Sequence, residues 1–238
     1  MIKALAVVPL VLAAASAEAQ VSVEGMIEAI EQHARQAPIA VGEGGIDQVV
    51  LDAMGDIPRH EFVPEEVEPY AYQDRPLPIG YGQTISQPFI VALMTDLLDV
   101  EPGDTVLEIG TGSGYQAAVL SPLVERVYTI EIVPELGQRA GRTLEELGFD
   151  NVETRIADGY YGWPEEAPFD AIVVTAAASH IPPPLVDQLA TGGRMVIPIG
   201  GAFSAQQLML VEKQSDGSVT TRQLLPVQFV PFTRAEDG

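Results

Sequence analysis

Apolar and polar positions along the chain switch between a helical period and short, continuous apolar runs. The apolar residues of Val23–Gln36 recur at the spacing of an amphipathic helix, and the glycines at positions 42, 44 and 45 break that pattern. Residues 46–54 predict a second helix that ends at Gly55. From residue 105 onward, β-prone runs alternate with helical segments. Such alternation is typical of an α/β protein with a mostly parallel sheet.

Five segments predict strands, at residues 106–109, 127–130, 152–156, 169–175 and 191–199. The segment 169–175 is near-continuously apolar, as expected for a strand that is buried on both faces of a parallel sheet. Helical segments at 116–123 and 135–147 separate the first three. Two last runs, 208–212 and 219–225, flank a Ser-Asp-Gly-Ser turn and predict a β-hairpin. The predicted fold is a doubly wound, mostly parallel sheet with helices on both faces and an antiparallel C-terminal hairpin.

Two irregular stretches precede the first predicted strand. In Ile-Pro-Arg-His-Glu-Phe-Val-Pro, the two prolines predict an extended link between Pro58 and Pro64. Arg59 and His60 could be ligands, but we expect Arg59 to tie the loop to neighbouring carboxylates and His60 to be structural. Residues 70–82 are rich in turn formers and aromatic groups and predict a long ordered loop. Such loops inside compact domains tend to be functional.

Ser86 precedes a predicted amphipathic helix at 89–98 and has two compatible interpretations. Its hydroxyl could cap that helix, because serine is a favoured N-cap residue and Pro88 suits the first turn. Alternatively, the hydroxyl could contact a substrate.

Composition excludes several classes of partner and site. The 238 residues include 34 acidic and 12 basic ones, so the net charge of −22 opposes binding to nucleic acid or to anionic membranes. The chain has no cysteine, which excludes disulfides, zinc–thiolate sites and a cysteine nucleophile. We expect no metal, no stable membrane anchoring and a monomer.

The first nineteen residues resemble a cleaved secretory signal. Lys3 precedes an apolar run at 4–15, and Ala17-Glu18-Ala19 ends the segment before Gln20. The run is too short to span a bilayer. We therefore expect export, with 20–238 as a single domain that carries an N-terminal helical extension at about 23–98. The alternative is a cytoplasmic protein that starts at Met26.

Gly110, Gly112 and Gly114 occupy alternate positions between a predicted strand and a predicted helix. Glycines there let the backbone approach a ligand, and the first N–H groups of the helix point toward it. The dinucleotide pattern G-x-G-x-x-G is absent because Tyr115 takes the place of its third glycine, so NAD is disfavoured. No lysine or arginine lies in the loop to offset phosphate charge. An unphosphorylated nucleoside such as S-adenosylmethionine fits better, with Glu131 accepting both ribose hydroxyls.

Ligands of doubly wound sheets bind at the carboxyl ends of the strands. We expect residues 108–114, Glu131, Asp158 and residues 176–180 to line one crevice there. Asp158 could accept a hydrogen bond from an adenine amino group, although an Asp-Gly turn is an equally ordinary role. His180 could face a substrate or could be only a polar loop residue.

The loop sequence Gly-Thr-Gly-Ser-Gly also invites comparison with serine hydrolases. Their nucleophile elbow needs a glycine two residues before and two residues after the serine. Thr111 and Tyr115 hold those positions around Ser113, which disfavours a hydrolase.

Six stretches closely resemble the protein-L-isoaspartate O-methyltransferase family, from about Met26 to Thr233. They are IPRHEFVP, PLPIGYGQTISQP, VLEIGTGSGY, ADG, GGRMVIPIG and QFVPFT. The QTISQP loop discriminates this family from other S-adenosylmethionine-dependent methyltransferases. The resemblance implies methyl transfer from S-adenosyl-L-methionine to the free carboxylate of L-isoaspartyl residues in damaged proteins and peptides, which initiates repair through a succinimide.

The resemblance also implies the residues of the site. Ser86 matches the family's active-site serine, and the implied cofactor-binding residues are Gln83, Thr84, Ile85, Glu108, Gly110, Gly112, Gly114, Glu131, Asp158, Gly159 and Thr233. The signal-like segment departs from the family pattern and leaves a competing hypothesis, an exported binding module of the same fold without catalysis. Methylation of a small carboxylate is a third hypothesis, which the QTISQP loop disfavours.

Overall fold

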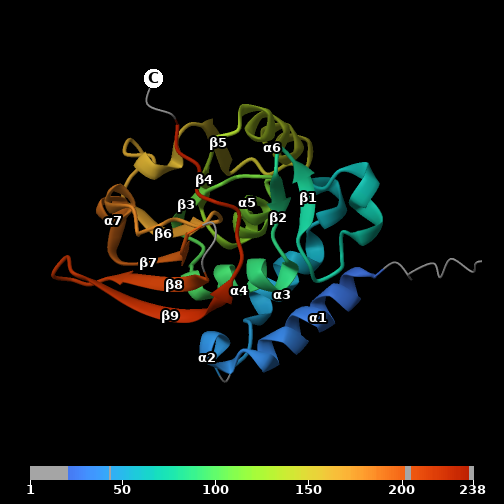
Figure 1. Cartoon of the computed structure of the whole chain (residues 1–238), viewed down its shortest axis with the longest axis horizontal. Helices are drawn as coiled ribbons and strands as arrows, with labels where there is room; N and C mark the ends of the chain where they lie inside the picture. The colour runs from blue at the N-terminus through green and yellow to red at the C-terminus, as the bar shows by residue number, and fades with distance from the viewer. Residues whose placement is uncertain (1–20, 43, 202–204, 236–238) are drawn as a thin grey trace, which may run out of the picture.

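A seven-stranded sheet forms the centre of the molecule, with strand order β5-β4-β3-β6-β7-β8-β9 (Figure 1). The computed structural model describes residues 21–42, 44–201 and 205–235. Neighbouring strands from β5 to β7 run parallel, and β8 and β9 are antiparallel additions. The strands are β3 (Thr105–Ile109), β4 (Arg126–Glu131), β5 (Val152–Ile156), β6 (Phe169–Val174), β7 (Leu189–Ile199), β8 (Gln206–Lys213) and β9 (Val219–Val227). The predicted fold class is confirmed.

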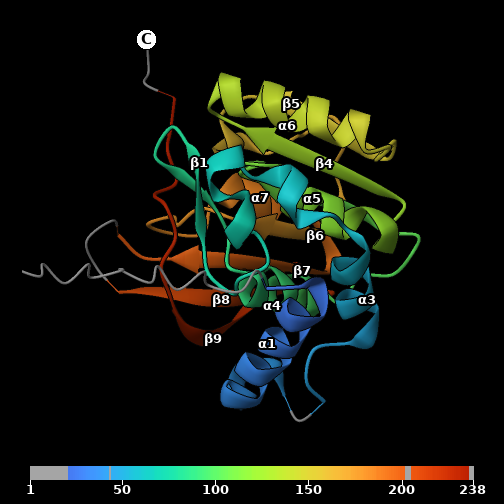
Figure 2. The same ribbon diagram turned by 90° about the vertical axis from the view of Figure 1, so that its right-hand side faces the viewer.

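Successive residues of each strand face opposite sides of the sheet, and each side has its own apolar core. Val106 and Val127 belong to the core that α1 to α6 cover, whereas Leu107 and Ile109 face the core that contains Leu185 of α7. Figures 1 and 2 show α1, α3 and α4 gathered on one side of the sheet. The helices are α1 (Val23–Gln36), α2 (Pro38–Val41), α3 (Gln48–Asp56), α4 (Pro88–Leu98), α5 (Tyr115–Leu120), α6 (Pro134–Glu146) and α7 (Pro183–Gln188).

The N-terminal half contains more regular structure than its sequence predicted. The first helix has the predicted bounds, but α3 begins later because the Asp47 side chain accepts a hydrogen bond from the Val49 N–H, and it continues past Gly55. The predicted extended link between Pro58 and Pro64 is wrong, since a 3-10 turn, η1 (Arg59–Phe62), lies between the two prolines. Three other 3-10 turns are η2 (Glu65–Tyr70), η3 (Ser121–Leu123) and η4 (Gly159–Tyr161).

A small hairpin occupies the end of the predicted irregular loop. Strands β1 (Leu77–Gly80) and β2 (Gln83–Ile85) pair antiparallel to each other. Tyr81 and Gly82 between them both have positive φ, 53° and 71°, which reverses the chain. The hairpin therefore carries Gln83 to Ile85 as an ordered strand.

Helix α4 has no cap from Ser86, so the capping interpretation is wrong. Its N-cap residue is Gln87, which makes no side-chain cap. The Phe89 N–H in the first turn instead donates to the Asp74 carboxylate at 2.8 Å. Asp74 is distant in sequence, and a local motif cannot identify such an acceptor.

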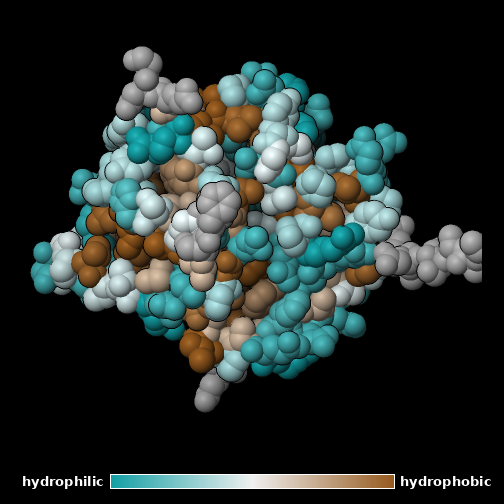
Figure 3. Space-filling model, in the orientation of Figure 1, coloured by the Kyte–Doolittle hydropathy of each residue, from teal (hydrophilic) through white to brown (hydrophobic). Residues whose placement is uncertain are grey.

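The surface is mostly polar over the N-terminal helices. Glu24, Glu28 and Glu31 lie exposed on the outer side of α1, and Figure 3 shows a hydrophilic area over that helix at the lower right. Within the described ranges, no helix is long and apolar enough to cross a membrane. The signal-like segment 1–19 lies outside the described residues.

Candidate active site

A pocket open to solvent lies at the carboxyl ends of β3, β4 and β6, with about 560 Å³ of empty space that includes its open mouth, and we call it the first cavity. The strands, the glycine loop, the β1–β2 hairpin and the C-terminal segment all contribute to its wall. Its lining comprises Gln83, Thr84, Ile109, Gly110, Gly112, Ile130, Glu131, Ile132, Val133, Gly159, Thr175, Ala176, Val230, Pro231, Phe232 and Thr233. A cavity therefore lies at the strand ends, where the sequence predicted the ligand site.

The glycine loop approaches the end of β6 closely. Gly110 has φ of 97°, and a Cβ atom there would lie 2.4 Å from Oγ1 of Thr175. No larger residue fits this position without displacing Thr175, whose hydroxyl donates to the Gly110 carbonyl at 2.7 Å. Gly114 serves a different purpose. It begins α5 and packs against Leu144 of α6, outside the lining of the first cavity.

Glu131 joins the glycine loop to the turn after β4. Its Oε2 accepts the Gly112 N–H at 2.7 Å, and its Oε1 accepts the N–H groups of Ile132 and Val133 at 2.9 Å each. The side chain is only 5% exposed, although the sequence suggested an exposed strand end. A carboxylate has about four acceptor sites, so one remains for a ligand in the first cavity. Binding of ribose hydroxyls by Glu131 stays a prediction.

A second cavity, also open to solvent and with about 320 Å³ of empty space including its mouth, adjoins the first and shares Thr84, Gly110, Gly112 and Thr175 with it. The residues that line only the second cavity are Ile85, Ser86, Val91, Glu108, Thr111, Ser113, Tyr115 and Gln116. Ser86 and Glu108 thus meet at one cavity although they come from different elements. Of the described residues that line either cavity, none is lysine or arginine.

Glu108 is fully buried at this second cavity. The Thr129 hydroxyl donates to its Oε2 at 2.6 Å, and its Oε1 has no hydrogen-bond partner among the described residues. Burial raises the pKa of Glu108 to about 8; the Thr129 hydrogen bond opposes this rise, and the Glu131 charge adds to it. The carboxyl therefore keeps its proton at neutral pH in the ligand-free protein.

This raised pKa predicts a pH-dependent stability. The pKa of Glu108 is about 4.5 in the unfolded chain and about 8 in the native protein. Its contribution to the free energy of unfolding is therefore complete below pH 4.5 and is lost as the pH rises through 8. Between pH 5.5 and 7.5, the ligand-free parent should lose about 1.4 kcal/mol of unfolding free energy per pH unit relative to Glu108→Gln. Denaturant titrations of both proteins measure this difference. Parallel pH profiles would contradict it.

Asp158 does not line either cavity, because the C-terminal segment, residues 228–235, engages its carboxylate. Oδ2 accepts from Nε of Arg234 at 2.9 Å and from the Ala235 N–H at 3.2 Å, while Oδ1 accepts the Tyr160 N–H. Burial alone would raise the pKa of Asp158, but these hydrogen bonds outweigh it and lower the pKa. Gly159, the next residue, does line the first cavity. The predicted contact between Asp158 and adenine stays untested.

The C-terminal segment is the part of the site that the residue pattern did not indicate. Figure 1 shows it, in red, running back from β9 across the sheet. The Ala177 N–H donates to the Val230 carbonyl at 2.8 Å, and the Phe232 N–H donates to the Ala177 carbonyl at 2.9 Å. These bonds place Val230 to Thr233 on the first cavity. Only Thr233 was expected there, through the family resemblance.

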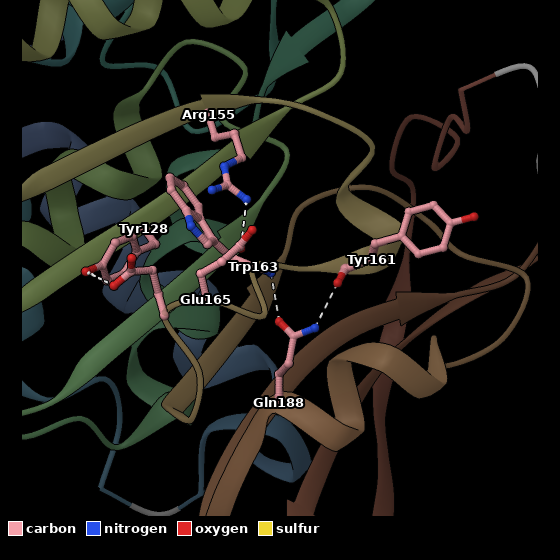
Figure 4. Close-up of polar contacts among 7 residues, drawn as sticks. Tyr128, Arg155, Tyr161, Trp163, Glu165 and Gln188 are labelled. Carbon is pink, nitrogen blue, oxygen red and sulfur yellow. Dashed lines mark hydrogen bonds and ion pairs between the residues drawn. The ribbon is translucent and has the colours of Figure 1, made fainter.

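Gln188 of α7 fixes the turn that follows Gly159 (Figure 4). Its Oε1 accepts the backbone N–H of Trp163 at 2.7 Å, and its Nε2 donates to the Tyr161 carbonyl at 2.8 Å. The guanidinium carbon of Arg155 lies over the Trp163 ring, 3.9 Å from its centre. No sequence motif indicated this support, because α7 and η4 meet only in the folded chain.

The remaining candidate side chains make local contacts that indicate no catalytic role. His180 is exposed and contacts the hydroxyls of Ser179 and Tyr160, and it lines neither cavity. His60 contacts the Tyr72 hydroxyl at 2.7 Å, as a structural residue would. Ser113 accepts the Tyr115 N–H at 3.3 Å in a local turn, which is no arrangement for a hydrolase nucleophile.

Comparison of the sequence with protein families gives one match that spans most of the chain. The model of the protein-L-isoaspartate(D-aspartate) O-methyltransferase (PCMT) family matches residues 41–237. A protein-L-isoaspartate O-methyltransferase 2 from Polaromonas sp. (strain JS666) is 63% identical over 208 residues, which cover 87% of this chain and 99% of the relative. A protein-L-isoaspartate O-methyltransferase 1 from Cupriavidus necator (strain H16) is 61% identical and is covered to 80%.

Solved structures agree with the sequence comparison. A structure of a protein-L-isoaspartate O-methyltransferase superposes with a TM-score of 0.75 at 30% identity, covering 88% of this chain and 65% of that longer chain. A beta-aspartate methyltransferase (PCMT) from Plasmodium falciparum, in complex with S-adenosyl-L-homocysteine, superposes with a TM-score of 0.73 at 26% identity. The match covers 90% of this chain and 99% of the other.

Proposed function

Because the chain belongs to the protein-L-isoaspartate(D-aspartate) O-methyltransferase family, we propose that the two adjoining cavities form its active site. The protein is an S-adenosyl-L-methionine-dependent enzyme that methylates the free carboxylate of L-isoaspartyl residues in damaged proteins and peptides. The observation that carries the proposed site is that Ser86, Glu108 and the glycine loop all line the second cavity, which adjoins the first through the glycine loop.

The first cavity suits the nucleoside part of the cofactor. Ile109, Ile130 and Phe232 supply apolar wall for a base, and the remaining acceptor site of Glu131 is available to a ribose hydroxyl. The absence of lysine and arginine from the described lining suits an unphosphorylated ligand. Glu108 would lie toward the positively charged methionine end, where its free Oε1 can accept a hydrogen bond. When bound, S-adenosyl-L-methionine supplies the electrophilic methyl group.

Ser86 would orient the substrate carboxylate in the second cavity. That carboxylate is ionised near neutral pH, so it needs no general base, and no catalytic histidine is required. Its oxygen forms the new bond to the methyl carbon while the sulfur–methyl bond breaks, and the two opposite charges cancel. The residues of the site therefore act by alignment and by exclusion of water.

A labelled methyl assay tests this function. The protein should transfer labelled methyl from S-adenosyl-L-methionine to an isoaspartyl peptide and not to an otherwise identical aspartyl peptide. Calorimetry with the cofactor supplies an independent binding measurement. Cofactor binding without methyl transfer would instead support a binding module of the same fold.

We also propose that residues 1–19 direct export. This proposal rests on Lys3, the apolar run at 4–15 and the small residues Ala17 and Ala19. When the full-length gene is expressed in a bacterial host with a working secretion pathway, the mature chain should begin at Gln20. N-terminal sequencing measures this directly. A chain that keeps Met1, or one that starts at Met26 and stays in the cytoplasm, would refute export.

A further inference from the structure

Arg59 is a fully buried cation next to the second cavity. It lies in η1, has no exposed surface, and burial lowers the pKa of its guanidinium. Its Nη1 has no hydrogen-bond partner among the described residues. Burying an arginine at such a position opposes folding unless its charge is compensated. Attraction to the Tyr115 and Asp74 side chains compensates part of this charge.

The contacts of Arg59 converge on the loop that carries Ser86. Its Nη2 donates to the Ser86 carbonyl at 2.7 Å, and its Nε donates to the Ala71 carbonyl at 2.8 Å. The guanidinium carbon lies 4.6 Å from the ring centre of Tyr115, which itself lines the second cavity. The sequence predicted that Arg59 would bind carboxylates. The structure shows carbonyl groups and an aromatic ring instead.

Asp74 holds the residues that follow Ser86 in the same loop. Its carboxylate accepts the Phe89 N–H at 2.8 Å and Nε2 of Gln87 at 3.2 Å, and it also contacts Nδ1 of His33. Arg59 thus holds the Ser86 carbonyl, and Asp74 holds the Gln87 side chain and the Phe89 N–H that follow it. This arrangement fixes the backbone from the Ser86 carbonyl to the first turn of α4.

We propose that Arg59 is a positioning residue for methyl transfer, which holds the Ser86 carbonyl and places a positive charge behind the loop that receives the substrate carboxylate. The inference rests on the proposed function of the second cavity. No cation among the described residues lines that cavity, so a guanidinium one layer behind it offsets the substrate's charge without pairing with it directly. A guanidinium fork can hold two carbonyls at once, which an ammonium cannot do with the same geometry.

Arg59→Met and Arg59→Lys test this proposal, with Lys213→Met as the matched control. Lys213 is a partly buried cation that donates to the carbonyls of Val186, Asp187 and Leu189, away from both cavities. Arg59→Met should lower kcat/KM for an isoaspartyl peptide by at least about tenfold, because small displacements of aligned groups are costly. The Kd of Arg59→Met for S-adenosyl-L-methionine should stay within about twofold of the parent value. The kcat/KM of Arg59→Lys should lie between the values of the parent and Arg59→Met. Lys213→Met should lose stability and keep the parent kcat/KM.

Fluorescence of Trp163, the single tryptophan and a buried one, reports whether each variant is folded. If Arg59→Met does not fold, Arg59→Lys decides, with an expected loss of about threefold or more in kcat/KM at unchanged cofactor affinity. Parent-like kcat/KM in a folded variant would overturn the inference, as would a loss of cofactor affinity equal to the loss of kcat/KM. An inactive parent protein would instead refute the proposed function, so the two failures are distinguishable.

Discussion

Replacement of Ser86 by aspartate should lower kcat/KM for an isoaspartyl peptide by about a hundredfold, because it sets a second carboxylate against the substrate carboxylate in the second cavity. Ser86→Ala should lower it by at least about tenfold, the equivalent of about 1.4 kcal/mol, through loss of the orienting hydroxyl. Initial-rate measurements with labelled cofactor give both values.

The structure separates this effect from helix stability. Because Asp74 accepts the Phe89 N–H and Ser86 is not the cap of α4, Ser86→Ala should change the free energy of unfolding by less than about 0.5 kcal/mol. Ser215→Asp, at the exposed tip of the C-terminal hairpin, adds the same charge far from the cavities and should keep the parent rate. A Ser86→Asp enzyme that methylates isoaspartyl peptide near the parent rate would rule out contact between the hydroxyl and the substrate.

The second large effect concerns the cofactor. Glu131→Ala should weaken binding of S-adenosyl-L-methionine by about 2 to 4 kcal/mol, since it removes the charged acceptor for a ribose hydroxyl and releases Gly112 from its bond to the carboxylate. Calorimetric titration measures the loss. An unchanged Kd in a folded mutant would remove Glu131 from the cofactor site.

This substitution should also affect folding, which the sequence alone did not indicate. Glu131 is buried and accepts three backbone N–H groups, so its removal leaves those donors unpaired. Glu131→Gln keeps one acceptor oxygen and most of the volume, so it should retain more stability than Glu131→Ala while still binding the cofactor weakly. Glu153→Ala is the control, because it removes an exposed carboxylate from the neighbouring strand β5. It should change neither quantity appreciably.

Local patterns were sufficient for the central sheet. The run at 169–175 became strand β6 with nearly the predicted bounds, because a near-continuous apolar segment is stable only when both of its faces are buried. The segment at 152–156 became strand β5 with the predicted bounds, although it is an edge strand with three polar residues. The glycines at 110 and 112 likewise marked the loop at the first cavity, since their spacing after a strand is itself a conformational requirement.

The sequence by itself determined the alternation of strands and helices in an α/β fold, the glycine loop and, through the QTISQP resemblance, the family. Tertiary structure alone decided which partners complete the site. Asp74 rather than Ser86 caps α4, Arg59 binds the Ser86 carbonyl, and Arg234 binds Asp158. Each pair joins residues that are separated by at least one secondary-structure element. Local propensity depends on neighbours within a few residues, whereas a buried polar group takes whichever donor or acceptor the packed elements bring within hydrogen-bond distance.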